Sequence, residues 1–121
     1  MNEHQETIFE DLSVLSFNIR EKQVGILVTR KRIEAIKAEM AKEEHSHKLY
    51  VKDCVDDSGK KLYTNDFMRD AAVVKRLDDS KTYQEMKASV IELTDGVEKE
   101  EIELGLLRRR FRVYEIVSRL E

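Results

Sequence analysis

Two histidines and the single cysteine lie close together near the middle of the chain: His45, His47 and Cys54. Imidazole and thiolate groups are the ligands that zinc prefers. A structural zinc site needs four protein ligands, however, and no further histidine or cysteine lies nearby in the sequence. We therefore interpret this segment as a polar connection between two elements, and we predict neither a metal ion nor another cofactor.

The other short motifs that could support catalysis are incomplete. Residues 59–61, Gly-Lys-Lys, lack the upstream glycine and the following hydroxyl residue of a phosphate-binding loop. No helix N-terminus or pair of basic residues stands beside Cys54 to activate its thiol. The sequence therefore predicts a protein that is not an enzyme.

A cluster of arginines around one aromatic residue indicates a different chemistry. It comprises Arg108, Arg109, Arg110, Phe111 and Arg112. In proteins that bind single-stranded nucleic acid, cations follow the phosphates and aromatic rings stack on the bases. These five residues are therefore the candidate nucleic-acid-binding site, and residues 30–32, Arg-Lys-Arg, form a second basic cluster.

The acidic residues offer another explanation for both clusters. The net charge of −3 provides no overall attraction to nucleic acid. In the helix pairing predicted below, the carboxylates of residues 6–11 lie opposite residues 108–112, and those of residues 92–95 lie near residues 30–32. Under this interpretation the arginines are neutralised within the protein, and Phe111 belongs to the core.

Two long helices would hold these residues in place. Between residues 7 and 44, one row of positions repeats at alternating steps of four and three, as in a supercoiled helix: Ile8, Leu12, Leu15, Ile19, Lys22, Ile26, Thr29, Ile33, Ile36 and Met40. A second row repeats with the same alternation between residues 80 and 120: Tyr83, Met86, Val90, Leu93, Val97, Glu100, Leu104, Leu107, Phe111 and Tyr114. Each helix is therefore expected to pack one face against a partner.

The charged residues of the two rows indicate how the helices pair. If the helices run antiparallel, the rows match step for step and Lys22 meets Glu100. Because an unpaired buried charge is costly, this ionic pair would fix the register. We predict an all-α fold in which residues 1–121 form a single domain, a long antiparallel coiled-coil helical hairpin.

The middle of the chain must connect the two helices. We expect residues 45–64 to form an arm, either a short β-hairpin or an irregular segment, because apolar residues flank a glycine-containing turn at residues 56–59. Residues 65–77 are expected to form a short helix at the tip of the hairpin, with a polar cap at its start.

A second apolar stripe remains on the long helices after they pair. Its members are Phe17, Val24, Val28, Ile102, Leu106, Val113 and Val117. The short helix cannot cover stripes of this length, since it spans only about 20 Å at 1.5 Å per residue. We therefore predict a homo-oligomer with this stripe as the interface.

Composition also indicates the compartment. A single cysteine cannot form an internal disulfide, which fits a reducing cytosol. Arg20 is the only lysine or arginine among residues 1–20, so we expect no secretory or mitochondrial leader. No apolar stretch is long enough to span a bilayer. We expect a cytoplasmic protein without a membrane partner.

Residues 59–66, Gly-Lys-Lys-Leu-Tyr-Thr-Asn-Asp, followed by Arg69, Leu77 and Tyr83, resemble a segment of small helical proteins of phages and prophages. More remotely, the order of a long helix, an arm and a late basic-aromatic patch is similar to phage recombination mediators of the T4 type. The resemblance implies a DNA recombination or replication accessory that oligomerises and contacts single strands through residues 108–112.

We therefore expect a non-catalytic oligomeric accessory protein that acts through protein partners, with single-stranded DNA as a further candidate partner. Two other functions fit the same sequence. One is a prefoldin-like holdase chaperone, which shares the order of helix, β-hairpin and helix and would hold unfolded clients at exposed apolar helix ends. The other is a purely structural adaptor.

Overall fold

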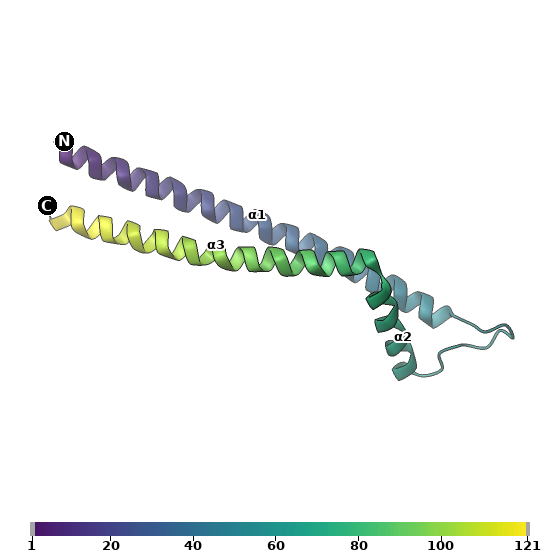
Figure 1. Cartoon of the computed structure of the whole chain (residues 1–121). Helices are drawn as coiled ribbons and strands as arrows, with labels where there is room; N and C mark the ends of the chain where they lie inside the picture. Colours follow the sequence, from purple (N-terminus) through teal and green to yellow (C-terminus); the bar gives the residue numbers. More distant parts are fainter. Residues whose placement is uncertain (1, 121) are drawn as a thin grey trace. The chain divides into compact units, whose positions relative to one another are not determined.

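The protein is all-α, as predicted. A computed structural model, which describes residues 2–120, contains three helices that pack against one another: α1 (Glu3–Asp53), α2 (Asp66–Asp79) and α3 (Lys81–Leu120) (Figure 1). No β-strand occurs among the described residues. The absence of proline from the sequence explains why the two outer helices run so far without a break.

The packing divides the chain into two compact units. The first unit comprises Met1–Lys31 together with Leu93–Glu121, and the second comprises Arg32–Glu92. Each long helix therefore contributes residues to both units, and each unit is described separately below.

In the first unit, segments of α1 and α3 lie side by side and run in opposite directions (Figure 1). Its core consists of Leu15, Ile26, Val97 and Leu104, each at most 8 % exposed. These four residues belong to the two rows identified in the sequence, and the remaining row members in this unit are half-buried. The flanking positions are almost all exposed, so one narrow face of each helix makes the core.

In the second unit, α2 packs against the later part of α1. Val51 is 1 % exposed and Val73 is 8 % exposed. Arg76 of α2 lies with its guanidinium carbon 3.7 Å from the centroid of the Tyr50 ring, and its Nε donates a 3.0 Å hydrogen bond to His47 Nδ1. A cation–aromatic contact and a hydrogen bond thus attach α2 to α1.

The predicted end of the first long helix at residue 44 is wrong. Residues 45–53 are helical and belong to α1, so the arm predicted for residues 45–64 is shorter than expected. The polar residues that suggested a break are satisfied within the helical arrangement, since His47 accepts from Arg76 and Glu44 accepts from Tyr83. Val51 then continues the buried face of α1.

The connection between α1 and α2 comprises residues 54–65 and is an irregular loop with a turn at its tip and no strand (Figure 1). A single isolated antiparallel bridge joins Val55 to Lys61. Gly59 has a φ of 84°, a value that residues other than glycine rarely adopt. Its amide donates a 3.0 Å hydrogen bond to the Asp56 carbonyl. Hydrogen bonds from Ser58, Lys60 and neighbouring amides hold the pKa of Asp56 below its ordinary value of 3.8.

Tyr83 provides a pH-sensitive contact in the second unit. Its hydroxyl donates a 2.6 Å hydrogen bond to Glu44 Oε1, and this bond, with burial, raises the pKa of Tyr83 above its ordinary value of 10.0. The stabilisation is therefore present below the unfolded pKa and is lost as the pH rises through the folded pKa.

We expect Tyr83→Phe to lower the free energy of unfolding by about 1 kcal/mol at neutral pH, because the hydrogen bond is partly exposed to solvent. The variant should also lose part of the destabilisation at alkaline pH that we expect for the unchanged protein, which urea titrations at neutral pH and at a pH above the tyrosine range would measure. Tyr114→Phe is the matched control, since the Tyr114 hydroxyl has no partner among the described residues. Equal effects of the two variants would show that the Glu44 contact contributes nothing.

Candidate nucleic-acid interface

One side of the first unit carries a shallow groove between α1 and α3. It consists of two adjoining hollows that share Gln23. We call it the arginine groove, and its lining residues are Phe9, Leu12, Ser13, Ser16, Phe17, Ile19, Arg20, Gln23, Ile26, Leu27, Arg30, Glu101, Leu104, Gly105, Arg108 and Phe111. Its floor is therefore apolar, and its rims carry three arginines against one glutamate.

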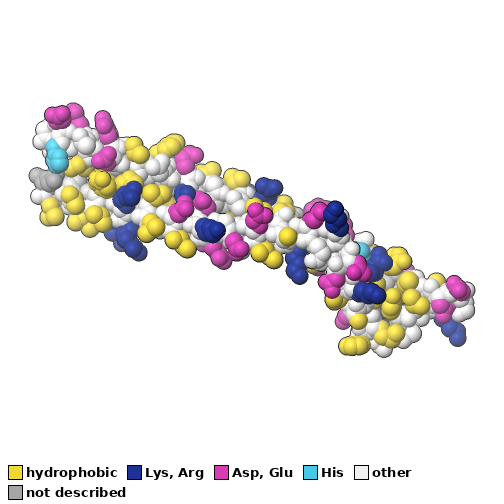
Figure 2. Space-filling view, viewed as in Figure 1, with side chains coloured by type: hydrophobic (Ala, Val, Ile, Leu, Met, Phe, Trp, Pro, Cys, Tyr) yellow, Lys and Arg dark blue, Asp and Glu magenta, His cyan; other side chains and the backbone are white. Residues whose placement is uncertain are grey.

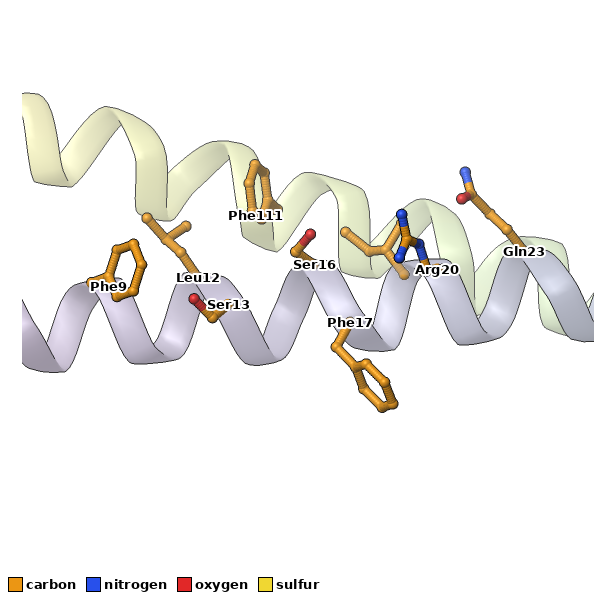
Figure 3. Close-up of a pocket in the computed structure, with 9 residues that line it drawn as sticks. Phe9, Leu12, Ser13, Ser16, Phe17, Arg20, Gln23 and Phe111 are labelled. Atoms are coloured by element: carbon orange, nitrogen blue, oxygen red, sulfur yellow. The ribbon is translucent and has the colours of Figure 1, made fainter.

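Figure 3 shows how the side chains of one hollow are arranged. Leu12 of α1 points toward α3, near Phe111, whereas the ring of Phe17 points away from α3. Phe9 and Phe17 are each 61 % exposed, and Phe111 is half-buried. The groove thus presents the exposed ring of Phe9 beside the ring of Phe111, which belongs to the row of α3 that packs against α1.

Two arginines of the groove have no partner within the part of the chain that the structure describes. Arg30 forms an ion pair with Glu101, which neutralises the only acidic residue of the groove. Arg20 and Arg108 are exposed, and neither has an ion pair or hydrogen bond among residues 2–120. Arg112 follows Arg108 by four residues and so lies on the same face of α3. The unpaired guanidinium groups of Arg20 and Arg108 therefore leave positive charge on the rims of the groove.

The expected neutralisation of the arginine cluster is wrong. No ion pair joins residues 108–112 to Glu6, Glu10 or Asp11 within the described chain. Glu10 and Arg109 show why. Each lies two residues before and two residues after a position of the row along which the two helices pack. At 100° per residue, such positions point away from the partner helix. Arg30 is also neutralised differently from the prediction, by Glu101 rather than by residues 92–95.

The structure separates the five residues that the sequence grouped together. Arg108 and Phe111 line the arginine groove, whereas Arg109, Arg110 and Arg112 line neither of its hollows. Arg20 and Phe9 join the groove from α1, and the sequence analysis missed both. They lie far from residues 108–112 in the sequence, and only the antiparallel register indicates that they are neighbours.

The predicted pair in the middle of the seam is also close in space. Lys22 Nζ lies 2.7 Å from Glu100 Oε2 and 2.5 Å from Glu103 Oε2. Hydrogen bonds to Glu100 and then Glu103 raise the pKa of Lys22 above its ordinary value of 10.5. Lys22 is therefore charged at neutral pH, and it is held by one carboxylate that was expected and one that was not.

Charge reversal at this site tests the register. We expect Lys22→Glu to lower the melting temperature measured by circular dichroism, because three carboxylates would then lie together. Adding Glu100→Lys should restore much of the loss, since opposite charges face each other again. Lys37→Glu, on an exposed pair with Glu34, is the control and should have a smaller effect. A double variant no more stable than the summed single variants would contradict this pairing.

Other candidate sites are not formed. The described residues contain no group of three or more side chains that could hold a metal ion, and His47 is instead engaged by Arg76. None of the described helices has a stretch that is long and apolar enough to cross a membrane.

Comparison of the chain with models of protein families, with curated proteins and with solved structures finds no match.

Proposed function

We propose that this protein is a non-catalytic, oligomeric accessory factor, of the kind that phages use in DNA recombination or replication, and that it binds single-stranded DNA along the arginine groove. Its scaffold would be an antiparallel coiled-coil hairpin that works through protein partners in the cytoplasm. The observation that carries the proposal is the pair of exposed, unpaired arginines, Arg20 and Arg108, beside the exposed ring of Phe9.

The groove has the features that single strands require. Cations that lack a protein partner are available for phosphates, and their counterions are released on binding. An exposed aromatic ring can stack on a base at any sequence, at a gain of roughly 1–3 kcal/mol per base. A shallow groove between two helices also lets an extended strand pass, whereas a duplex would meet only the rim.

The first experiment measures binding directly. Fluorescence anisotropy of a labelled oligothymidylate of roughly 20 nucleotides should report binding at about 50 mM salt, and a loss of about tenfold or more in affinity at about 200 mM salt. A duplex of the same length should bind more weakly. Absence of binding at the lower salt concentration would contradict the nucleic-acid part of the proposal.

Variants then locate the site. The double variant Arg20→Gln/Arg108→Gln should weaken binding by about tenfold and reduce the salt slope by about 2, one for each lost phosphate contact. Phe9→Ala should weaken binding several-fold with little change in the salt slope. Lys75→Gln/Lys87→Gln removes the same charge from exposed positions of the second unit and should leave affinity almost unchanged. Equal losses in both double variants would place the binding site elsewhere.

The second candidate function is a prefoldin-like holdase. It is favoured by large apolar side chains that remain exposed, such as Phe67 at 82 % and Met68 at 39 % at the start of α2. Suppression of the aggregation of an unfolded client, together with absence of DNA binding, would favour this function. If neither activity is found, a structural adaptor is the remaining possibility.

A further inference from the structure

Each long helix carries a second row of residues in the first unit, on the face away from its partner. On α1 the row repeats at steps of three and four and contains Val14, Phe17, Glu21, Val24, Val28 and Lys31. On α3 it repeats in the same way and contains Lys99, Ile102, Leu106, Arg109, Val113, Ile116 and Leu120. We call these the outer rows, and every member is exposed.

The outer rows are apolar enough to be unusual on a surface. The α1 row has four large apolar side chains between 50 % and 62 % exposed, and the α3 row has five between 51 % and 82 % exposed. Figure 2 shows hydrophobic side chains reaching the surface along this unit. Contiguous exposed apolar rows of this kind mark contact surfaces. Each row also contains a charged residue at its middle, Glu21 on α1 and Arg109 on α3, and neither has a partner among the described residues.

We propose that the α1 outer row binds the α3 outer row of a second copy of this chain, antiparallel, with Glu21 paired to Arg109. In this register the apolar residues meet in successive layers: Val14 with Ile116, Phe17 with Val113, Val24 with Leu106, and Val28 with Ile102. The steps of the two rows then match throughout, so large apolar residues face each other on both sides of the ionic pair. At the end of the contact Lys31 lies beside Lys99, where both side chains extend into solvent.

Charge complementarity and the number of apolar layers together favour this contact over the other pairings of these rows. The α3 row contains no acidic residue, so a contact between two α3 rows would leave Arg109 facing an apolar residue or another cation. Two antiparallel α1 rows can pair Glu21 with Lys31, but they keep only the two layers of Val24 with Val28 and leave Arg109 unpaired. A parallel contact can pair Glu21 with Lys99, but it keeps only two apolar layers and places Phe17 opposite Asp95. Only the antiparallel contact between unlike helices satisfies both charges and four apolar layers.

The positions of the rows determine the type of assembly. We call the rows along which α1 and α3 pack within one molecule the inner rows. At 100° per residue, the outer row of a helix lies about 160° around the helix axis from its inner row. Each helix is therefore contacted on nearly opposite sides, which does not allow two copies to close into a four-helix bundle. The contact joins unlike surfaces and repeats from copy to copy, so it builds a ring of more than two copies or a filament.

The test is the mass of the native protein in solution. At roughly 100 µM, light scattering after size exclusion should give three or more times the chain mass of 14.2 kDa. Glu21→Arg and Arg109→Glu should each reduce the mass to that of one chain while leaving the helical circular dichroism unchanged. An equimolar mixture of the two variants, and the double variant, should regain the larger mass, because opposite charges again face each other. Glu98→Arg changes an exposed, unpaired residue off the outer rows and should have no effect.

This inference rests on the proposed oligomerisation and not on DNA binding, and the outcomes are separable. A wild-type chain that stays monomeric overturns both the contact and the oligomeric part of the proposed function. A wild-type dimer, or an oligomer that neither charge reversal dissociates, overturns the head-to-tail contact alone. The anisotropy measurements on the arginine groove are a separate readout in every case.

Discussion

Ile26→Ala is expected to lower the free energy of unfolding by about 3 kcal/mol. Ile26 is 4 % exposed and lies in the core of the first unit with Val97 and Leu104. Truncation removes buried apolar area and leaves a cavity, because the neighbouring helix cannot move in without breaking its own contacts. In a core only one row deep, few other contacts offset this loss. Urea unfolding followed by circular dichroism measures the change.

The adjacent residue gives the control for this prediction. Leu27 is 55 % exposed, so Leu27→Ala removes a similar number of carbon atoms without opening a cavity. Its effect should stay within about 0.5 kcal/mol, since alanine also favours the helix. If Leu27→Ala were as destabilising as Ile26→Ala, the buried face of α1 would be assigned wrongly.

Val51→Ala is expected to cost about 2 kcal/mol, the second-largest effect among the changes considered. Val51 is the most buried side chain of the described chain, at 1 % exposed, and it lies in the second unit near the end of α1. Its loss should loosen α2. Deuterium exchange at the amides of residues 66–79 should therefore become faster than in the unchanged protein, and it should rise more than exchange in the first unit.

The same residue type on α2 provides the comparison. Val74 is 57 % exposed, and Val74→Ala should change stability by no more than about 0.5 kcal/mol. A small effect of Val51→Ala, together with unchanged exchange in α2, would show that the second unit does not depend on this contact.

The inner rows could be predicted from the sequence because they follow from helix geometry alone. Alternating steps of three and four identified every buried or half-buried position between Leu12 and Met40 except Gln23. The end of α1 could not be predicted in this way, because the buried face continues through Glu44 and His47 before Val51. Polar residues at half-buried positions of this kind become acceptable when partners on other helices satisfy them, as Tyr83 does for Glu44 and Arg76 for His47.

The packed face of α2 is difficult to predict from the sequence for a related reason. Two of its large apolar residues do not pack, since Phe67 is 82 % exposed and Val74 is 57 % exposed. The packed face instead contains Val73 and the stems of Arg69 and Arg76. Arginine stems can bury alongside aromatic rings while their charged ends find hydrogen-bond partners, so a hydrophobic pattern alone does not reveal this face.

The order of contacts along the chain has a consequence for how the protein reaches its native state. The hydrogen bond from Arg76 to His47 spans 29 residues and that from Tyr83 to Glu44 spans 39, whereas the bond from Lys22 to Glu103 spans 81. Closing a shorter loop costs less chain entropy. Nucleation is therefore favoured at the α1–α2–α3 contacts of residues 32–92, and the remaining helix pair would then zip from there toward the chain ends.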